Sequence, residues 1–116
     1  MFRLMRGDSE LGCSPLEGLD DGMAVATGNF VPSAGYGDVA SLFRRISDAI
    51  EARSIPPELW TERDALTLRL LGPDGDQIPV DWIMVYDYGD ELDRELHVKL
   101  ASMTAWKKVH DPRSAG

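Results

Sequence analysis

Cysteine and positive charge are both scarce in this chain of 116 residues, which has 12 basic and 20 acidic side chains. The single cysteine, Cys13, excludes an internal disulfide and a multi-cysteine zinc site within one chain. The net charge of -8 opposes a broad electrostatic contact with nucleic-acid phosphates or anionic lipid. We therefore expect no nucleic-acid partner and no membrane partner. Net charge is also the sole argument for an acidic mimic of nucleic acid.

Long hydrophobic runs are missing as well, since runs such as Trp82 to Tyr86 fall far below the about 20 residues that cross a bilayer. The segment Met1 to Arg6 is interrupted by charge and lacks the apolar core of a secretory signal, so we expect a cytoplasmic location. Apolar residues make up 43% and charged residues 28% of the chain, as in folded globular proteins. These values predict one domain over residues 1–110 and a disordered tail over residues 111–116.

Motifs that bind cofactors or carry catalysis are absent. The serines occur without the Gly-x-Ser-x-Gly elbow of a nucleophile, and Gly35-Tyr36-Gly37 lacks the further glycine and preceding strand of a dinucleotide-binding turn. A calcium loop that began at Asp87 would place Gly89 where a liganding side chain is needed and Leu92 where a glycine is needed. We therefore expect no cofactor and no bound metal, and we assign no catalytic residue.

Apolar and polar residues alternate through three runs in the second half of the chain, which is typical of strands. The runs are Leu66 to Leu71, Ile78 to Tyr88 and Glu95 to Leu100. The segment Gly72 to Asp76 predicts a hairpin between the first two runs, because proline and glycine favour a tight turn. The middle run is apolar on both parities. It therefore predicts the central strand of a three-stranded meander, covered on both faces.

The first half of the chain predicts three more strands and two helices. The strands are expected near Phe2 to Leu4, Leu11 to Leu16 and Met23 to Val31. A helix is expected from Asp38, because apolar residues recur at helical spacing from Val39 to Ile50. Pro56-Pro57 ends this helix and starts a short second one. The whole order predicts an α+β fold, with an antiparallel sheet of about five to six strands and one long and one short helix packed on one face.

An acidic turn after the middle strand holds the densest group of ionisable side chains in the sequence. We expect a partner-binding surface there, formed by Asp87, Tyr88, Asp90, Glu91, Asp93 and His97. The expected function is a non-enzymatic protein-binding or accessory module that uses this turn, with a protein as its partner. The simpler alternative is a solvated turn between strands. The sequence leaves the oligomeric state open between monomer and homodimer.

A small hydrolase or a cation-dependent enzyme is the alternative function. His97 is expected to share one strand face with Glu95 and Lys99, where a carboxylate can orient the imidazole for acid and base chemistry. The simpler alternative is a surface histidine without a catalytic role. This hypothesis places the site near His97 and the acidic turn.

The three tryptophans suggest different environments. Trp82 lies in the middle predicted strand, so we expect it in the core. Trp60 lies on the short predicted helix and Trp106 lies near the tail. Because tryptophan anchors many interfaces, both are candidates for exposed contacts, and both can instead cap the sheet.

Overall fold

The computed structural model describes residues 1–89, 93–103 and 106. The elements in chain order are β1 (Phe2–Arg6), β2 (Ser9–Ser14), β3 (Gly18–Asp20), β4 (Val25–Pro32), the 3-10 helix η1 (Ala34–Asp38), α1 (Ala40–Glu51), α2 (Pro57–Ala65), β5 (Leu68–Leu71), β6 (Gln77–Ile78), β7 (Val80–Tyr86) and β8 (Arg94–Leu100). Asp90, Glu91 and the predicted tail over residues 111–116 lie outside the described residues.

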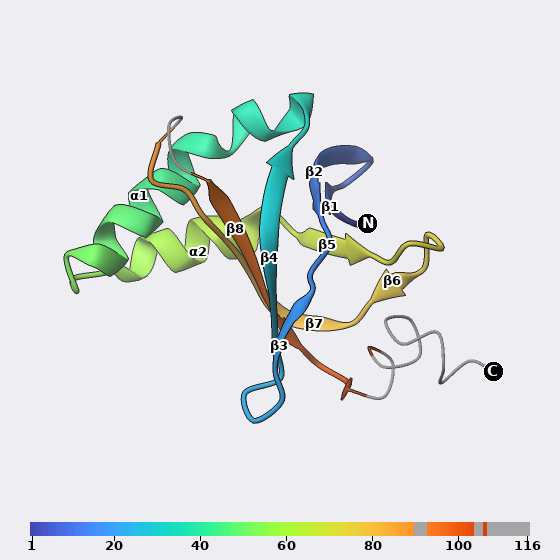
Figure 1. Cartoon of the computed structure of the whole chain (residues 1–116). Coiled ribbons are helices and arrows are strands. Elements are labelled where there is room, and N and C mark those ends of the chain that lie inside the picture. Colours follow the sequence, from blue (N-terminus) through green and yellow to red (C-terminus); the bar gives the residue numbers. More distant parts are fainter. Residues whose placement is uncertain (90–92, 104–105, 107–116) are drawn as a thin grey trace.

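One antiparallel sheet contains all the strands, in the order β6-β5-β1-β2-β4-β8-β7, with β3 paired to β4 beside this path. The two ends of this order, β6 and β7, are consecutive in the chain and are separated by Pro79 alone. The sheet therefore curls until its ends meet, and Figure 1 shows it nearly closed. Proline lacks an N–H donor, so Pro79 suits the corner where pairing stops.

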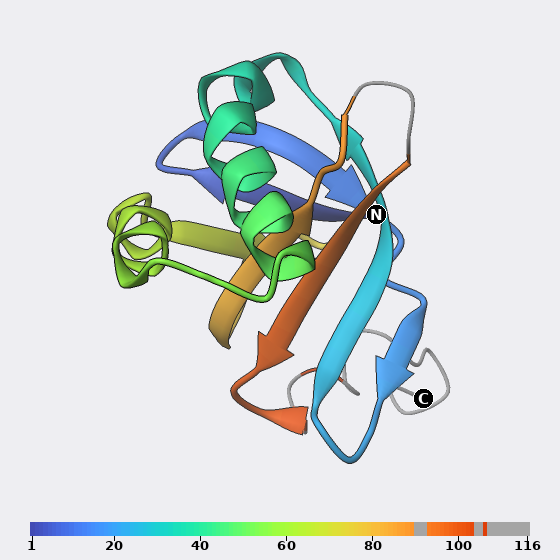
Figure 2. The same ribbon diagram turned by 90° about the vertical axis from the view of Figure 1, so that its left-hand side faces the viewer.

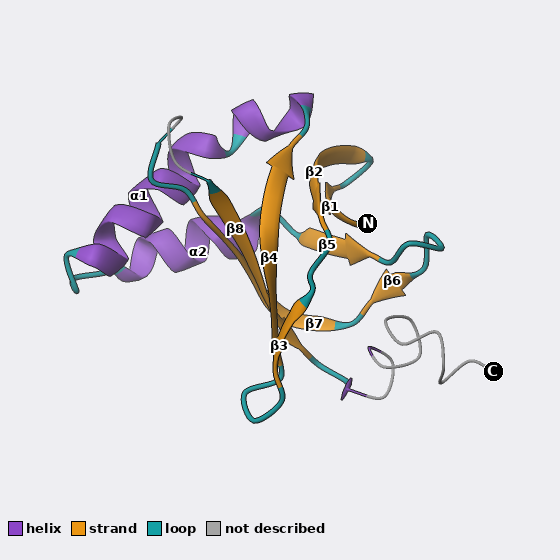
Figure 3. Cartoon of the chain, in the orientation of Figure 1, coloured by secondary structure: helices purple, strands orange, loops and turns teal. Residues whose placement is uncertain are grey.

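The predicted α+β fold with a sheet of five to six strands is wrong, because the structure is mostly a nearly closed antiparallel sheet of eight strands with two helices. Figure 3 shows the strands in orange as a strongly curved sheet, with α1 and α2 at one side. One additional strand is β3, which has only three residues and no alternating pattern to announce it. The other arises because the predicted strand Ile78 to Tyr88 is two strands, divided at Pro79.

The predicted meander is correct only in part, because the run Ile78 to Tyr88 pairs with β5 through β6 and with β8 through β7 but is not one central strand. β7 lies at one end of the sheet order and pairs with β8, while β5 pairs with the distant β1 and with β6. The hairpin over Gly72 to Asp76 is confirmed, and it joins β5 to β6. The alternation of apolar and polar residues did not predict the strand order, because it shows which face a side chain occupies and not which strand lies alongside.

Both predicted helices are confirmed. α1 buries Leu42, Phe43 and Ile46, which belong to the predicted apolar stripe, and it contacts β7 and α2 (Figure 2). It begins two residues after Asp38, because Ala34–Asp38 forms η1 first. α2 begins at Pro57, whose fixed φ angle and missing donor suit the first turn of a helix. In the part of the chain that the structure describes, no helix is long and apolar enough to cross a membrane.

The pairing of β7 with β8 sorts their side chains onto two faces. The inner face carries buried aliphatic side chains, namely Ile83, Val85, Leu96 and Val98. The outer face carries Trp82, Met84, Tyr86, Glu95, His97 and Lys99. This parity explains why the sequence of β7 is apolar on both sides. One side faces the core, and the other faces a surface that α2 borders.

Gly28 allows two segments to approach within van der Waals contact. A Cβ atom at this position would lie 2.6 Å from the Ser14 hydroxyl and 2.7 Å from the backbone nitrogen of Leu16. Leu16 is itself fully buried, so it cannot move outward to relieve the contact. Gly28 is therefore required by the close packing of β4 against the chain that follows β2.

We predict that Gly28→Ala lowers the free energy of unfolding by about 2 kcal/mol, because the new methyl group overpacks a rigid site. The matched control is Gly37→Ala, since a Cβ atom there would have no neighbour within 4 Å. The free energy of unfolding of this control variant should lie within about 0.5 kcal/mol of the wild-type value. Urea denaturation measures both variants, and an equal effect at the two glycines would contradict the packing argument.

Candidate functional site

The structure separates the described residues of the predicted acidic-turn surface. Asp87 is completely buried, whereas Tyr88 is 39% exposed and Asp93 is exposed. His97 is half-buried on the outer face of β8. The carboxylate of Asp87 therefore belongs to the interior, while Tyr88 and Asp93 remain at the surface.

The carboxylate of Asp87 accepts hydrogen bonds from several parts of the fold. The Tyr36 hydroxyl donates to Oδ2 at 2.7 Å, and Nε of Arg94 donates to the same oxygen at 3.1 Å. Nε of Arg44 lies 3.4 Å from Oδ1, and the backbone N–H of Gly89 donates to Oδ1 at 3.0 Å. Both oxygens are therefore satisfied, and two guanidinium groups balance the buried charge.

The backbone N–H of Asp87 is bound by Ser47, which lies on α1. The N–H of Asp87 donates to the Ser47 hydroxyl at 2.9 Å, and this hydroxyl donates to the Phe43 carbonyl at 2.7 Å. Ser47 and Asp87 are both fully buried. Among the described residues, no buried side-chain nitrogen or oxygen lacks a hydrogen-bond partner. This arrangement fixes the end of β7 against η1, α1 and β8.

The titration of this network supports a structural role. Burial raises the pKa of Asp87, but the hydrogen bonds from Tyr36, Gly89 and Arg94 outweigh it and leave the pKa below its usual value. Burial and the neighbouring carboxylate raise the pKa of Tyr36 well above its usual value. Asp87 therefore stays ionised and Tyr36 stays protonated at neutral pH, so neither group is suited to proton transfer there.

His97 forms the one pair that resembles an acid and base site among the described residues. Its Nε2 lies 3.1 Å from Oε1 of Glu95, and its ring lies 4.5 Å from the ring of Tyr86. The predicted face of β8 is confirmed, since His97 lies with Glu95 and Lys99 opposite the buried residues of the strand. In the described ranges, no group of three histidine, cysteine or acidic residues is placed to hold a metal ion.

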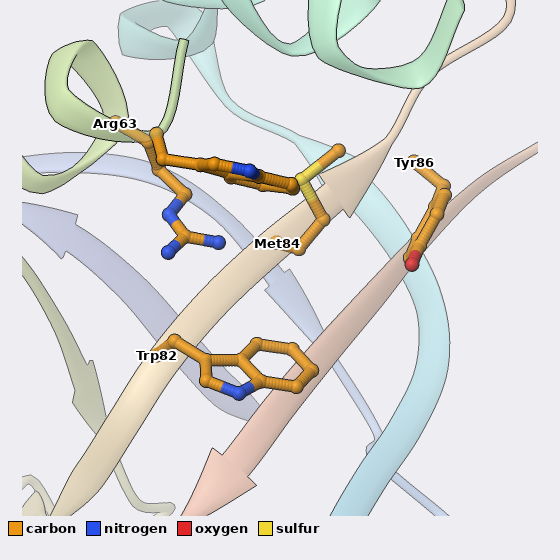
Figure 4. A pocket seen from close by; sticks show the side chains of 5 residues that line it. Arg63, Trp82, Met84 and Tyr86 are labelled. Carbon is orange, nitrogen blue, oxygen red and sulfur yellow. The ribbon is translucent and has the colours of Figure 1, made fainter. Parts of the chain in front are cut away.

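A groove of about 390 Å³ lies on the outer face of the sheet, between α2 and β7. Trp60 and Arg63 line it from α2, and Trp82, Met84 and Tyr86 line it from β7 (Figure 4). The three residues from β7 alternate along the strand, so they point to the same side. The guanidinium carbon of Arg63 lies 4.6 Å from the centre of the Trp60 ring. This groove, called the aromatic groove below, thus combines aromatic surfaces with one cation.

The tryptophans show how much of this groove the sequence could indicate. Trp82 was expected in the core, yet it is half-buried in the groove. Trp60 was a candidate for exposed contacts and lines the same groove. Trp106 is buried and stacks on Phe2, with 4.9 Å between ring centres, so it caps the sheet. Parity placed Trp82, Met84 and Tyr86 together, but nothing in the sequence showed that α2 would form the opposite wall.

These features define the class of the molecule as a small protein with a nearly closed antiparallel sheet and an aromatic surface groove. Comparisons with protein-family models, with curated proteins and with solved structures found no match to this chain. A functional conclusion therefore depends on the chemistry of the groove and of the residues around it.

We predict that Asp87→Asn lowers the free energy of unfolding by about 3 kcal/mol at neutral pH, because it removes the buried negative charge that Arg44 and Arg94 both contact. The lowered pKa of Asp87 means that the carboxylate stabilises the wild type above its usual pKa of 3.8. This stabilisation is lost as the pH falls through the lowered value. The difference between variant and wild type should therefore shrink in acid.

Urea denaturation at neutral pH and in acid measures this dependence. Tyr36→Phe is the matched variant, because it keeps the ring and removes only the hydroxyl that donates to Asp87. Tyr36→Phe should lower the free energy of unfolding by a smaller amount, about 1.5 kcal/mol. A difference between Asp87→Asn and wild type that does not change with pH would contradict the charge argument.

Proposed function

We propose that this protein is a binding module that holds a short segment of a partner protein in the aromatic groove. The observation that supports the proposal most directly is the convergence of Trp60, Trp82 and Tyr86 on one half-buried surface. Tryptophan, tyrosine and arginine are the residues that most often dominate binding energy at protein interfaces. The groove also contains Arg63, so all three residue types are present.

The size of the groove favours a peptide side chain over a large cofactor. Pockets that enclose small molecules commonly measure about 300 to 1,000 Å³, and the aromatic groove lies near the lower limit at about 390 Å³. Its floor includes Met84, which is buried, and methionine adapts to apolar groups of different shape. An apolar side chain of a partner can therefore displace water from this groove and contact the aromatic rings.

Tyr88 and His97, two described residues of the predicted partner-binding surface, contribute to the same proposal. Burial and the Glu51 carboxylate raise the pKa of Tyr88, and Tyr86 and Glu95 contribute to the same shift. The ring of His97 lies 4.5 Å from the ring of Tyr86, which lines the groove. We propose that Tyr88 and His97 extend the partner-binding surface beyond the aromatic groove. Asp87 does not contact the partner, because its buried carboxylate is already hydrogen-bonded to other residues of the protein.

Selection of a random peptide library displayed on phage tests this function. We expect the wild type to enrich peptides that share an apolar residue, and Trp82→Ala to weaken their binding about 30-fold, as loss of a major interface anchor does. The control is Met23→Ala, because Met23 is 61% exposed and does not line the groove. Enrichment that is equal for the wild type and Trp82→Ala would count against the proposal.

The pair of His97 and Glu95 supports the second candidate, a small hydrolase or a cation-dependent enzyme. Its supporting observation is the 3.1 Å distance between Nε2 and Oε1, which lets the carboxylate orient the imidazole. The pair lies beside Tyr86 and therefore next to the aromatic groove. A substrate in the groove would lie close to this pair.

Divalent cations distinguish the cation-dependent version of this candidate. A cation that binds the native state must raise the melting temperature, and the shift must grow with its concentration. We expect Mg²⁺, Ca²⁺, Mn²⁺ and Zn²⁺ to leave the melting temperature unchanged if the protein is the binding module proposed above. A shift that His97→Gln abolishes would support the enzyme instead.

A further inference from the structure

A second hollow of about 170 Å³ adjoins the aromatic groove. The residues that line it are Arg63, Asp64, Thr67, Leu68, Val80, Asp81, Trp82 and Ile83. Arg63 and Trp82 line both hollows, so the two lie side by side along β7 and together make up one depression of the surface. A ligand that fills the aromatic groove can therefore extend into the second hollow, which is called the acidic hollow below.

The two hollows differ in charge. Arg63 is the ionisable group that gives the aromatic groove a charge of +1 when the phenol of Tyr86 is neutral. The acidic hollow adds Asp64 and Asp81 to the same arginine, so one positive and two negative groups leave it at -1. The depression is thus apolar and positive at one end and polar and negative at the other.

Asp81 is the group best placed to meet a ligand. It is exposed, and no hydrogen bond or ion pair of its carboxylate is found within the described part of the chain. The register between β7 and β8 shifts between Val80 and Trp82, so Asp81 lies at an irregularity of the strand. The Asp64 side chain is 70% exposed, and only its Oδ1 is engaged, by Nε and Nη2 of Arg63 at 3.4 and 3.3 Å. Both carboxylates are accessible to a cation.

Arg63 determines where a basic group of the ligand can bind. Its guanidinium group lies over Trp60 in the aromatic groove, where it would repel a second cation. In the acidic hollow the same charge is outweighed by the two carboxylates. A lysine or arginine of a partner is therefore favoured in the acidic hollow and disfavoured in the aromatic groove, which accepts an apolar residue.

The spacing between the two positions follows from β7. The aromatic groove is centred near Met84 and the acidic hollow near Asp81, three residues apart on one strand. At about 3.3 Å per residue this separation is about 10 Å. An extended peptide that follows the strand covers the same distance in about three residues.

We infer that the partner segment carries an apolar anchor for the aromatic groove and, about three residues away, a lysine or arginine that Asp81 and Asp64 select. This inference rests on the proposed function and names the chemistry of its partner. The net charge of -8 adds a general attraction to a basic segment, and that attraction falls as salt screens it.

The peptides selected by the wild type test the inference. We expect most of them to combine the apolar residue with a basic residue about three positions away. A selected peptide should bind the double variant Asp64→Asn, Asp81→Asn about fivefold more weakly at low salt, as expected for exposed charge pairs. The difference should disappear in high salt. Asp8→Asn is the matched control, because Asp8 is also an exposed carboxylate and lines neither hollow.

The outcomes separate this inference from the proposed function. Peptides that Trp82→Ala rejects but that lack a basic residue, or that bind the double variant with full affinity, overturn the inference and leave the proposed function standing. Peptides enriched in acidic residues also overturn it, because they indicate recognition by Arg63. Absence of any peptide that prefers the wild type over Trp82→Ala overturns both. Fluorescence of Trp60 and Trp82 reports the binding directly.

Discussion

A carboxylate removed from water must have its charge balanced and its oxygens hydrogen-bonded, or it destabilises the fold that buries it. Asp87 meets this requirement with donors from η1, α1, β8 and the segment that follows β7. Gly89 and Arg94 are near Asp87 in the chain, whereas Tyr36 and Arg44 are 51 and 43 residues away, so the requirement is met only when η1 and α1 are in place. The network therefore fixes the end of β7 and the position of α1 over the sheet, and α2 packs against α1.

The position of β7 connects this network to the surface. Its inner side chains complete the core, whereas its outer side chains face α2 across the aromatic groove. Pro79 separates β6 from β7, which lie at the two ends of the strand order in the nearly closed sheet. The groove is thus built on regular elements that the core holds in place. Such a rigid surface loses little conformational entropy when it binds a ligand.

The chemistry of the groove favours binding over catalysis. The buried pair Asp87 and Tyr36 is hydrogen-bonded internally and to Arg94, and the lowered pKa of Asp87 and raised pKa of Tyr36 keep their charge states fixed at neutral pH. The groups that face the groove are aromatic rings, a thioether and Arg63, which supply contact area and one charge. The adjoining hollow adds Asp64 and Asp81, so the two ends of this surface differ in charge, and under the proposed function they would distinguish the two ends of an extended ligand.

The sequence by itself determined the local structure: the α1 stripe from Leu42 to Ile46, the start of α2 at Pro57, the hairpin over Gly72 to Asp76 and the two faces of β8. Each depends on periodicity or turn chemistry among neighbouring residues. Only the tertiary structure decided that β5 pairs with β1, that Asp87 is buried and that Trp60 lies near Trp82. These features depend on contacts between distant segments. The residues next to an aspartate that follows a strand do not show whether its carboxylate is buried against arginines or exposed to water.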